Sequence, residues 1–244
     1  MNITLFEEAE LLKPLAALDP RARHLLKTLG KKAGDEFCAG VLGGKTGTGK
    51  IRGINSDGAL ELDFSLTEDA PARLPVEIAV GFVRPIQIKR ILRELATFGV
   101  EKISITGTDL GEKSYRDTTL LKDGGAEAAL IAGAVQGRDT VLPKLTVYEN
   151  VASWLDSLDR RGKALVAADN ISPEGMFSEF RSAQPAFIIA VGSERGWSDN
   201  ERNNFKKAGF KRLSLGGRPL RTETAVIAAA VLAQSKLHAS IHKC

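Results

Sequence analysis

The chain has 244 residues and a net charge of +4, and its 43% hydrophobic and 26% charged residues are typical of a globular protein with a sizeable core. The longest apolar run, residues 225–233, is too short to cross a membrane, and the N-terminus lacks the pattern of a signal peptide. Cys38 and Cys244 lie far apart in the sequence and suggest no disulfide framework. We therefore expect a cytoplasmic protein.

Charge is distributed unevenly near the N-terminus. Residues 20–55 carry eight Lys and Arg side chains against two acids, whereas residues 56–75 carry five acids against one Arg. A local basic block of this kind suits a polyanion such as RNA, and a solvated charged surface is the alternative.

The first third of the chain has the patterns of β-strands. Residues 37–42 and 51–54 are short strand candidates, and residues 60–66 alternate apolar and polar side chains. The pair Asp57 and Gly58, just before that alternation, is a hairpin turn signal. These patterns predict a small sheet or barrel.

The stretch GGKTGTGK at residues 43–50 nearly matches a phosphate-binding loop. Such a loop leads from a buried strand into a helix and places Ser or Thr after its lysine to hold Mg²⁺. Here Ile51 follows Lys50, and no helical pattern comes next. We interpret the stretch as a glycine-rich hairpin between two strands. No G-x-G-x-x-G follows a predicted strand either, so a dinucleotide site is unsupported.

Residues 67–75 contain two prolines and mixed charges, which predicts a linker between two domains. Beyond it, strand patterns alternate with helical ones. Strands are predicted at residues 78–83, 102–106, 164–168, 187–191 and 213–215, and helices at residues 88–95, 151–158, 199–208 and 222–237. This alternation predicts an α/β domain with a mostly parallel sheet covered on both faces. The expected domains are therefore residues 1–72 and 73–244.

Two glycine-containing loops follow predicted strands in the last third of the chain. GSERGWSDNE follows residues 187–191, and its Ser198 and Glu201 have the spacing of a capping box for the next helix. GGRPLRTETA follows residues 213–215. Ligands of open parallel sheets bind beyond the carboxyl ends of strands, so these loops are expected to form a site. Their backbone donors and acceptors suit the edge of a neutral base such as adenine.

The second loop also contains charged residues between a buried strand and a predicted buried helix. Arg218, Arg221 and Glu223 either form an internal ion pair or belong to the site, because unpaired buried charge is costly.

These segments resemble a known family. VGSERGWSDNE at residues 191–201 and GRPLRTETAVIAAAV at residues 217–231 resemble the C-terminal signature of the SPOUT methyltransferases. The similarity is greatest to the ribosomal RNA small subunit methyltransferase E family, which is specific for uridine N3. RARHLLKTLGKKAGDEF, near the N-terminus, resembles the start of that family's PUA-like barrel. RPIQIKRILRELATFGVEKI, GEKSY and QGRDTVLPKL resemble its middle.

The resemblance implies a fold and an activity. Residues 1–72 are expected to form a PUA-like RNA-binding β-barrel, and residues 73–244 a SPOUT α/β domain with a deep trefoil knot that binds S-adenosyl-L-methionine. The implied reaction is methylation of uridine N3 in small-subunit (16S) ribosomal RNA, either free or in the assembled small ribosomal subunit. The protein is expected to form a homodimer, to use no metal ion and not to associate with a membrane.

The resemblance also implies which residues of this chain form the site, at the positions that match the family's motifs. The expected cofactor-binding residues are Ala168, Gly192, Ser193, Glu194, Gly196, Leu213, Leu215, Gly216, Arg218, Leu220, Arg221, Thr222, Thr224 and Ala225. Arg221 is the first candidate for catalysis, followed by Glu223 and Glu194, since N3 must lose its imide proton and an arginine can stabilise charge on the uracil oxygens. The expected RNA-binding residues of the basic block are Arg21, Arg23, His24, Lys45, Lys50 and Arg52.

Two residues of the first loop depart from the family's pattern. Ser193 stands where the family has proline, and Arg195 stands where it has its second glycine. If the loop needs a positive φ at residue 195, an arginine strains it. The alternative to the enzyme is therefore a catalytically weak or inactive SPOUT-fold protein that binds RNA.

A metal site is a further alternative. His238, His242 and Cys244 lie close in sequence at the C-terminus, but no second pair of cysteines or histidines accompanies them. We therefore predict no metal.

Overall fold

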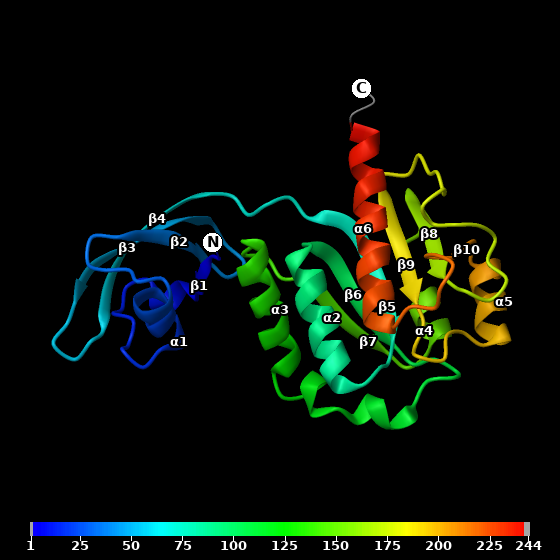
Figure 1. Cartoon of the computed structure of the whole chain (residues 1–244), viewed down its shortest axis with the longest axis horizontal. Helices are drawn as coiled ribbons and strands as arrows, with labels where there is room; N and C mark the ends of the chain where they lie inside the picture. Colours follow the sequence, from blue (N-terminus) through cyan, green and yellow to red (C-terminus); the bar gives the residue numbers. More distant parts are fainter. Residues whose placement is uncertain (1, 242–244) are drawn as a thin grey trace. The chain divides into compact units, whose positions relative to one another are not determined.

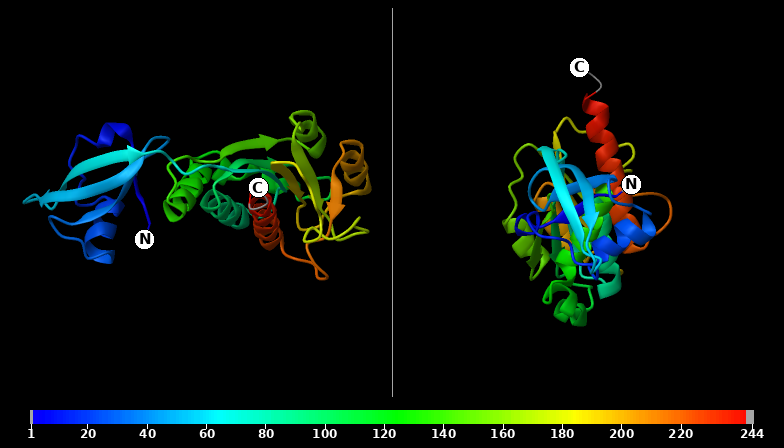
Figure 2. Two further views of the ribbon diagram at one scale, coloured as in Figure 1. Left: turned by 90° about the horizontal axis from the view of Figure 1, so that it is seen from above. Right: turned by 90° about the vertical axis from the view of Figure 1, so that its left-hand side faces the viewer.

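The structure, a computed structural model, describes residues 2–241 (Figures 1 and 2). The chain divides into two compact units. The first comprises the residues up to Ala72 together with Ala132–Leu142, and the second comprises Arg73–Ile131 and the residues from Pro143 onward. In the described part of the chain no helix is long and apolar enough to span a membrane, and no cluster of side chains could hold a metal ion. His242 and Cys244 of the alternative metal site lie outside the described residues.

The first unit contains a four-stranded sheet with the order β1-β2-β3-β4. Strands β1 and β2 are parallel and the other neighbours are antiparallel. Its elements are β1 (Thr4–Phe6), a 3-10 turn (Glu8–Glu10), α1 (Pro20–Arg23), a π-turn (His24–Thr28), β2 (Glu36–Val41), β3 (Thr46–Ile54) and β4 (Leu60–Glu68). The buried side chains of Phe6, Leu25, Phe37 and Ile51 pack together in its core.

The hairpin predicted for GGKTGTGK is confirmed, but β3 begins at Thr46, earlier than residue 51. The turn is confined to residues 42–45, and Gly43 has φ 73° there. A Cβ atom on Gly47 would lie 2.1 Å from the Ser65 carbonyl oxygen, and one on Gly49 would lie 2.5 Å from the Phe37 ring. These two glycines therefore permit close packing inside the sheet, which is why a glycine-rich sequence forms a strand.

The second unit contains a six-stranded parallel sheet with the order β10-β8-β9-β5-β6-β7 (Figure 1). Its strands are β5 (Leu74–Gly81), β6 (Val100–Thr106), β7 (Lys144–Tyr148), β8 (Lys163–Ala168), β9 (Ala186–Val191) and β10 (Lys211–Leu213). The helices are α2 (Pro85–Thr97), α4 (Val151–Asp156), α5 (Asp199–Lys207) and α6 (Thr222–Ile241), and short 3-10 turns span Lys113–Asp117 and Thr119–Leu121. Helix α3 (Gly125–Gly137) begins in the second unit, and its residues from Ala132 onward belong to the first. The predicted parallel α/β sheet is confirmed.

Helices cover both faces of this sheet, as Figure 2 shows. Helices α2 and α6 pack against each other on one face, and α4 and α5 lie on the other. Under α4 and α5 a cluster of aromatic rings forms the core, with Trp197 and Phe205 4.7 Å apart between ring centroids. The predicted apolar stripe of α2 is confirmed, because Ile88, Ile91 and Leu95 are buried.

Several predicted boundaries are wrong. The linker is shorter than residues 67–75, because β4 continues to Glu68 and β5 begins at Leu74. Strand β10 ends at Leu213, so Leu215 lies in the following loop. Helix α6 is not buried on all sides, since Val231 is 45% exposed. Helix α3 and strand β7 have no counterpart among the predictions, because α3 is rich in Ala and Gly and shows no apolar stripe.

The segment that follows β8 lies beside β10. The Asp169 N–H donates to the Leu213 carbonyl at 3.0 Å, on the β8 side of β10. On its other side, the Phe177 N–H donates to the Ser214 carbonyl at 2.8 Å, and the Ser214 N–H donates to the Gly175 carbonyl at 2.9 Å. Strand β10 therefore runs between β8 and the connection that leads from β8 to β9.

Candidate functional site

The loop after β9 contains a tight turn. The Gly196 N–H donates to the Ser193 carbonyl at 2.9 Å, and Gly196 has φ 71°. A Cβ atom on Gly192 would lie 3.0 Å from the Gly196 Cα, so the two glycines allow the chain to fold back on itself. Among the described residues that are not glycine, only Arg138 and Ser172 have positive φ. The expectation of strain at Arg195 is therefore wrong, because the glycine that follows it takes the left-handed conformation.

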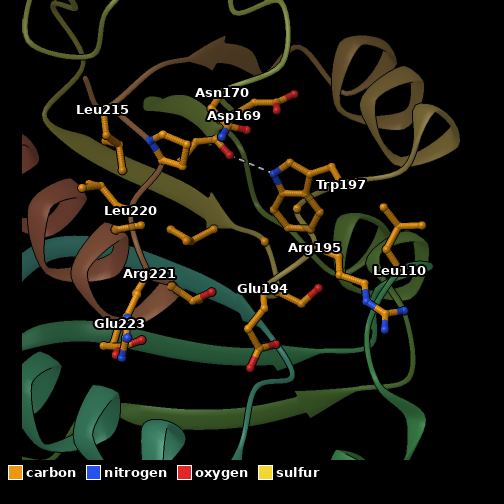
Figure 3. A pocket seen from close by; sticks show the side chains of 18 of the residues that line it. Leu110, Asp169, Asn170, Glu194, Arg195, Trp197, Leu215, Leu220, Arg221 and Glu223 are labelled. Carbon is orange, nitrogen blue, oxygen red and sulfur yellow. Dashed lines mark hydrogen bonds between the residues drawn. The ribbon is translucent and has the colours of Figure 1, made fainter. Parts of the chain in front are cut away.

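Buried side chains hold this loop against the sheet. The Trp197 indole N–H donates to the Ala168 carbonyl at 2.9 Å, which ties the loop to the end of β8 (Figure 3). The buried Ser193 hydroxyl lies 3.1 Å from the Thr108 hydroxyl, within hydrogen-bond distance. The serine that replaces the family's proline thus connects the loop to the segment after β6.

The capping box predicted for α5 is confirmed. The Glu201 N–H donates to the Ser198 hydroxyl, and the Ser198 N–H donates to the Glu201 carboxylate at 2.8 Å. Glu201 also accepts the Asp109 N–H at 3.0 Å, although its side chain is buried. Burial raises the pKa of Glu201 above its ordinary value. The two backbone N–H groups that donate to the carboxylate lower this pKa, but burial has the larger effect.

A second network supports the loop after β10. The buried Asp169 carboxylate pairs with Arg202 on α5 at 2.8 Å and with Arg212 on β10 at 3.7 Å. The Ser214 hydroxyl accepts the Gly216 N–H at 3.2 Å and donates to the Gly216 carbonyl at 2.8 Å. Both loops are therefore anchored at the carboxyl edge of the sheet, where the sequence predicts a site.

The two loops, the end of β8 and the start of α6 line one pocket of about 870 Å³. Most of the predicted residues line it, namely Ala168, Gly192, Ser193, Glu194, Gly196, Leu215, Gly216, Arg218, Leu220, Arg221, Thr222, Glu223 and Ala225. Leu213 and Thr224 do not: the Leu213 side chain is buried in β10, and Thr224 is exposed on α6. These two predictions are not supported by the geometry.

Sequence reasoning missed part of the lining. Arg84 and Gln87 come from the start of α2, and Leu110, Glu112 and Tyr115 come from the segment after β6. The same rule that located the glycine loops would have located these residues, since they follow β5 and β6 at the same edge of the sheet. No glycine motif marks them. Asp169, Asn170, Ile171, Trp197 and Pro219 were also missed as lining residues.

Of the two alternatives for Arg218, Arg221 and Glu223, the internal ion pair is absent from the described residues. Arg218 and Arg221 are exposed, and neither has an ion-pair partner there. Glu223 is 7% exposed, and its Oε2 atom has no hydrogen-bond partner. A buried, unsatisfied carboxylate oxygen that lines a pocket is costly unless a ligand supplies a donor. The pocket therefore combines exposed cations with a buried acceptor (Figure 3).

Part of the predicted RNA-binding set has a structural role in the first unit. The Arg21 guanidinium pairs with Glu10 at 2.6 Å and with Asp19 at 2.8 Å, and it lies over the Phe6 ring. The Arg21 side chain therefore stabilises the fold of the first unit, and its ion pairs argue against the predicted role in RNA binding.

The other basic residues of that set differ in their surroundings. Arg52 pairs with Glu61 at 3.0 Å, and Lys45 lies 3.6 Å from Asp69, so acids partly neutralise both. Arg23 and Lys50 are exposed without an ion-pair partner among the described residues, and His24 is half-buried. Of the predicted RNA-binding set, Arg23 and Lys50 thus present exposed charges without an ion-pair partner among the described residues.

Comparison with known proteins gives close relatives along the whole chain. Residues 70–234 match the family described as RNA methyltransferase domain. Ribosomal RNA small subunit methyltransferase E of Treponema pallidum (strain Nichols) is 34% identical, over 98% of this chain and 92% of its own. Ribosomal RNA small subunit methyltransferase E 1 of Borreliella burgdorferi is 33% identical, over 97% of this chain and 99% of its own.

Solved structures share the fold. The ribosomal RNA small subunit methyltransferase E of Neisseria gonorrhoeae, solved with S-adenosyl methionine, has a TM-score of 0.73 at 19% identity and covers 96% of this chain and 97% of its own. A probable rRNA-methyltransferase of Porphyromonas gingivalis has a TM-score of 0.75 at 19% identity and covers 98% of this chain and 99% of its own.

Proposed function

The chain belongs to the ribosomal RNA small subunit methyltransferase E family, and we propose that it transfers a methyl group from S-adenosyl-L-methionine to N3 of a uridine in small-subunit (16S) ribosomal RNA. The observation that carries the proposal is the pocket at the carboxyl edge of the parallel sheet, where both motif loops meet. The substrate is free RNA or the assembled small subunit.

The pocket fits the cofactor in size and in chemistry. Its volume of about 870 Å³ lies in the range of small-molecule sites. Leu215 and Leu220 provide apolar faces for the adenine ring, and the backbone around Gly192 and Gly216 provides donors and acceptors for its edge. When bound, the cofactor would supply a methyl group carried on a positively charged sulfur, with a neutral thioether as the leaving group.

The residues of the pocket then have distinct roles. Glu223 accepts the imide proton of uracil N3, because its buried oxygen faces the pocket without a donor. The exposed Arg221 stabilises the negative charge that spreads onto the uracil oxygens as the proton leaves. Glu194, exposed on the turn, is a weaker candidate for the proton acceptor. With its proton held by Glu223, N3 would be the nucleophile for the methyl group that the bound cofactor supplies, and the proposal involves no metal.

The non-catalytic alternative loses its main support. Strain at Arg195 motivated it, and Gly196 takes the positive φ instead. We therefore favour the enzyme over a protein that only binds RNA.

We also propose the topology that the family resemblance implies. The C-terminal segment, from β10 into α6, threads through the connection between β8 and β9 and forms a trefoil knot. The backbone hydrogen bonds on both sides of β10 support this threading. The sheet of the first unit, with its apolar core, supports a PUA-like RNA-binding barrel.

A homodimer and a cytoplasmic location complete the proposal. The exposed Val231 and the half-buried Ile227 and Ala228 lie on one side of α6, which leaves an apolar surface for a second copy of the chain. Ribosomal RNA as the substrate supports a cytoplasmic location.

The proposal is tested by methyl transfer. The protein is incubated with cofactor labelled in its methyl group and with ribosomal subunits from cells that lack this enzyme. Label is expected in the RNA of the small subunit and not in that of the large subunit. Cofactor binding without label in any RNA would contradict the proposal and favour the non-catalytic alternative.

A further inference from the structure

One part of the pocket lies outside both glycine loops. Arg84 and Gln87 at the start of α2, with Leu110 and Tyr115 from the segment after β6, line this part. In Figure 3 Leu110 and Arg195 lie on the side of the pocket opposite Leu215 and Leu220. Leu110 belongs to the same segment as Tyr115, so this side of the pocket includes residues that are not expected to hold the cofactor.

Arg84 and Tyr115 form a pair at this side. The Arg84 Nε–H donates to the Tyr115 hydroxyl at 3.3 Å, although the two residues are far apart in the sequence. The hydrogen bond to Tyr115 raises the pKa of Arg84, and the nearby charge of Glu194 adds to it. Arg84 is therefore held by the tyrosine hydroxyl while its side chain remains exposed.

Gln87 adds a buried acceptor. Its Oε1 atom is buried and has no hydrogen-bond partner, as is also true of Glu223 Oε2. Both residues line the same pocket, Gln87 from the first turn of α2 and Glu223 from the first turn of α6. Two buried acceptors without donors point to a ligand that carries N–H or O–H groups, and the exposed charge of Arg84 suits a ligand that also carries negative charge.

We propose that Arg84, Gln87 and Tyr115 form the subsite for the target nucleotide, with the base stacked on the Tyr115 ring. A nucleotide matches all three side chains: its ring stacks on an aromatic side chain, its phosphate pairs with an arginine, and its ribose hydroxyl donates to the amide oxygen. This inference rests on the proposed function, because it assumes that the remaining pocket holds the cofactor.

Binding measurements test the subsite separately from catalysis. The ligands are small ribosomal subunits from cells that lack the enzyme, with S-adenosylhomocysteine present so that no methyl transfer occurs. Affinity for the subunits is measured by filter binding, and affinity for S-adenosylhomocysteine by calorimetry. The variants are Tyr115→Ala, Tyr115→Phe and Arg84→Ala. The control is Arg161→Ala, which removes an exposed arginine at the amino end of β8, away from the pocket.

Tyr115→Ala is expected to weaken subunit binding about tenfold or more, because a stacked ring is lost. Arg84→Ala is expected to weaken it as well, whereas Tyr115→Phe and the control stay within about threefold of the wild type, since Phe still stacks. All variants should bind S-adenosylhomocysteine like the wild type, which also confirms that they fold. Unchanged subunit binding by both Tyr115→Ala and Arg84→Ala, or a parallel loss of cofactor affinity, would overturn the subsite. If the wild type binds subunits but never methylates them, the proposed function fails while these affinities still decide the subsite.

Discussion

Glu223 is the residue on which the proposed chemistry depends most. It is 7% exposed and its Oε2 atom has no partner, so it is available to accept a proton inside the pocket. Glu223→Gln keeps the size of the side chain and removes the base. We expect kcat to fall about 10²- to 10⁴-fold with little change in cofactor affinity. Single-turnover methyl transfer and calorimetry measure the two quantities.

Glu194→Gln is the matched control for Glu223→Gln, because Glu194 is an exposed carboxylate of the same pocket. A larger loss of kcat in this control than in Glu223→Gln would move the proton acceptor to the turn after β9.

Arg195 is the residue at which this chain differs most from its family's pattern. Its backbone is unstrained, and its side chain is exposed at the rim of the pocket. Arg195→Gly is therefore expected to leave cofactor affinity within about twofold and to weaken RNA binding by removing one phosphate contact. Filter binding at several salt concentrations measures this, since a lost contact lowers the salt dependence. A gain in activity on Arg195→Gly would show instead that the arginine obstructs the site.

Among the elements, α5 and its capping box connect the two sides of the pocket. Glu201 accepts N–H groups from Ser198 and from Asp109, and burial raises its pKa above the ordinary value of 4.5. The folded protein therefore binds this proton more tightly than the unfolded chain does. The ionised carboxylate costs stability at neutral pH, and the cost disappears as pH falls through the raised pKa.

Glu201→Gln removes that titration. The free energy of unfolding of the wild type, relative to Glu201→Gln, is expected to increase as pH is lowered from neutral toward the ordinary carboxyl pKa of 4.5. Urea denaturation of both proteins across this range provides the measurement. A difference that stays constant, or one that shrinks on acidification, is incompatible with a raised pKa for Glu201.

The elements also show what the sequence could predict. The parallel sheet, α2, α5 and both glycine loops follow from apolar runs, helical spacing and caps, which are local signals. The predicted start of β3 was wrong because Gly47 and Gly49 were interpreted as part of a turn. Both glycines lie in the strand, where they make room for Ser65 and Phe37 on the neighbouring strands. Helix α3 was missed because its Ala- and Gly-rich sequence has no apolar stripe.

The candidate site was predicted only as far as its motifs extend. Both glycine loops match sequence motifs, and most of the residues predicted from those motifs line the pocket. Gln87 and Tyr115 lie in the segments RPIQIKRILRELATFGVEKI and GEKSY, which resemble the family but indicated no site role, and the fold of the chain brings them to the pocket. The ion pairs of Arg21 likewise depend on Glu10 and Asp19, whose proximity becomes visible only in three dimensions.

At the scale of the whole molecule, the first unit is proposed to bind RNA and the second to bind the cofactor. Lys50 is exposed on β3 without an ion-pair partner among the described residues. Lys50→Glu is expected to weaken binding to small subunits about threefold to tenfold at low salt and to leave cofactor affinity unchanged. Filter binding and calorimetry are the assays.

Lys207→Glu makes the same charge change on α5 in the second unit and serves as the control for Lys50→Glu. Equal effects of the two substitutions would indicate a nonspecific response to net charge and would argue against an RNA-binding surface around Lys50.

The identity of the methylated nucleoside tests the central claim most directly. Small ribosomal subunits from cells that lack the enzyme are incubated with the protein and S-adenosyl-L-methionine, and their RNA is digested to nucleosides for chromatography and mass spectrometry. The proposed function predicts 3-methyluridine, formed by the wild type and strongly reduced with Glu223→Gln. A different methylated nucleoside, or none under conditions in which the protein binds both cofactor and subunits, would contradict it.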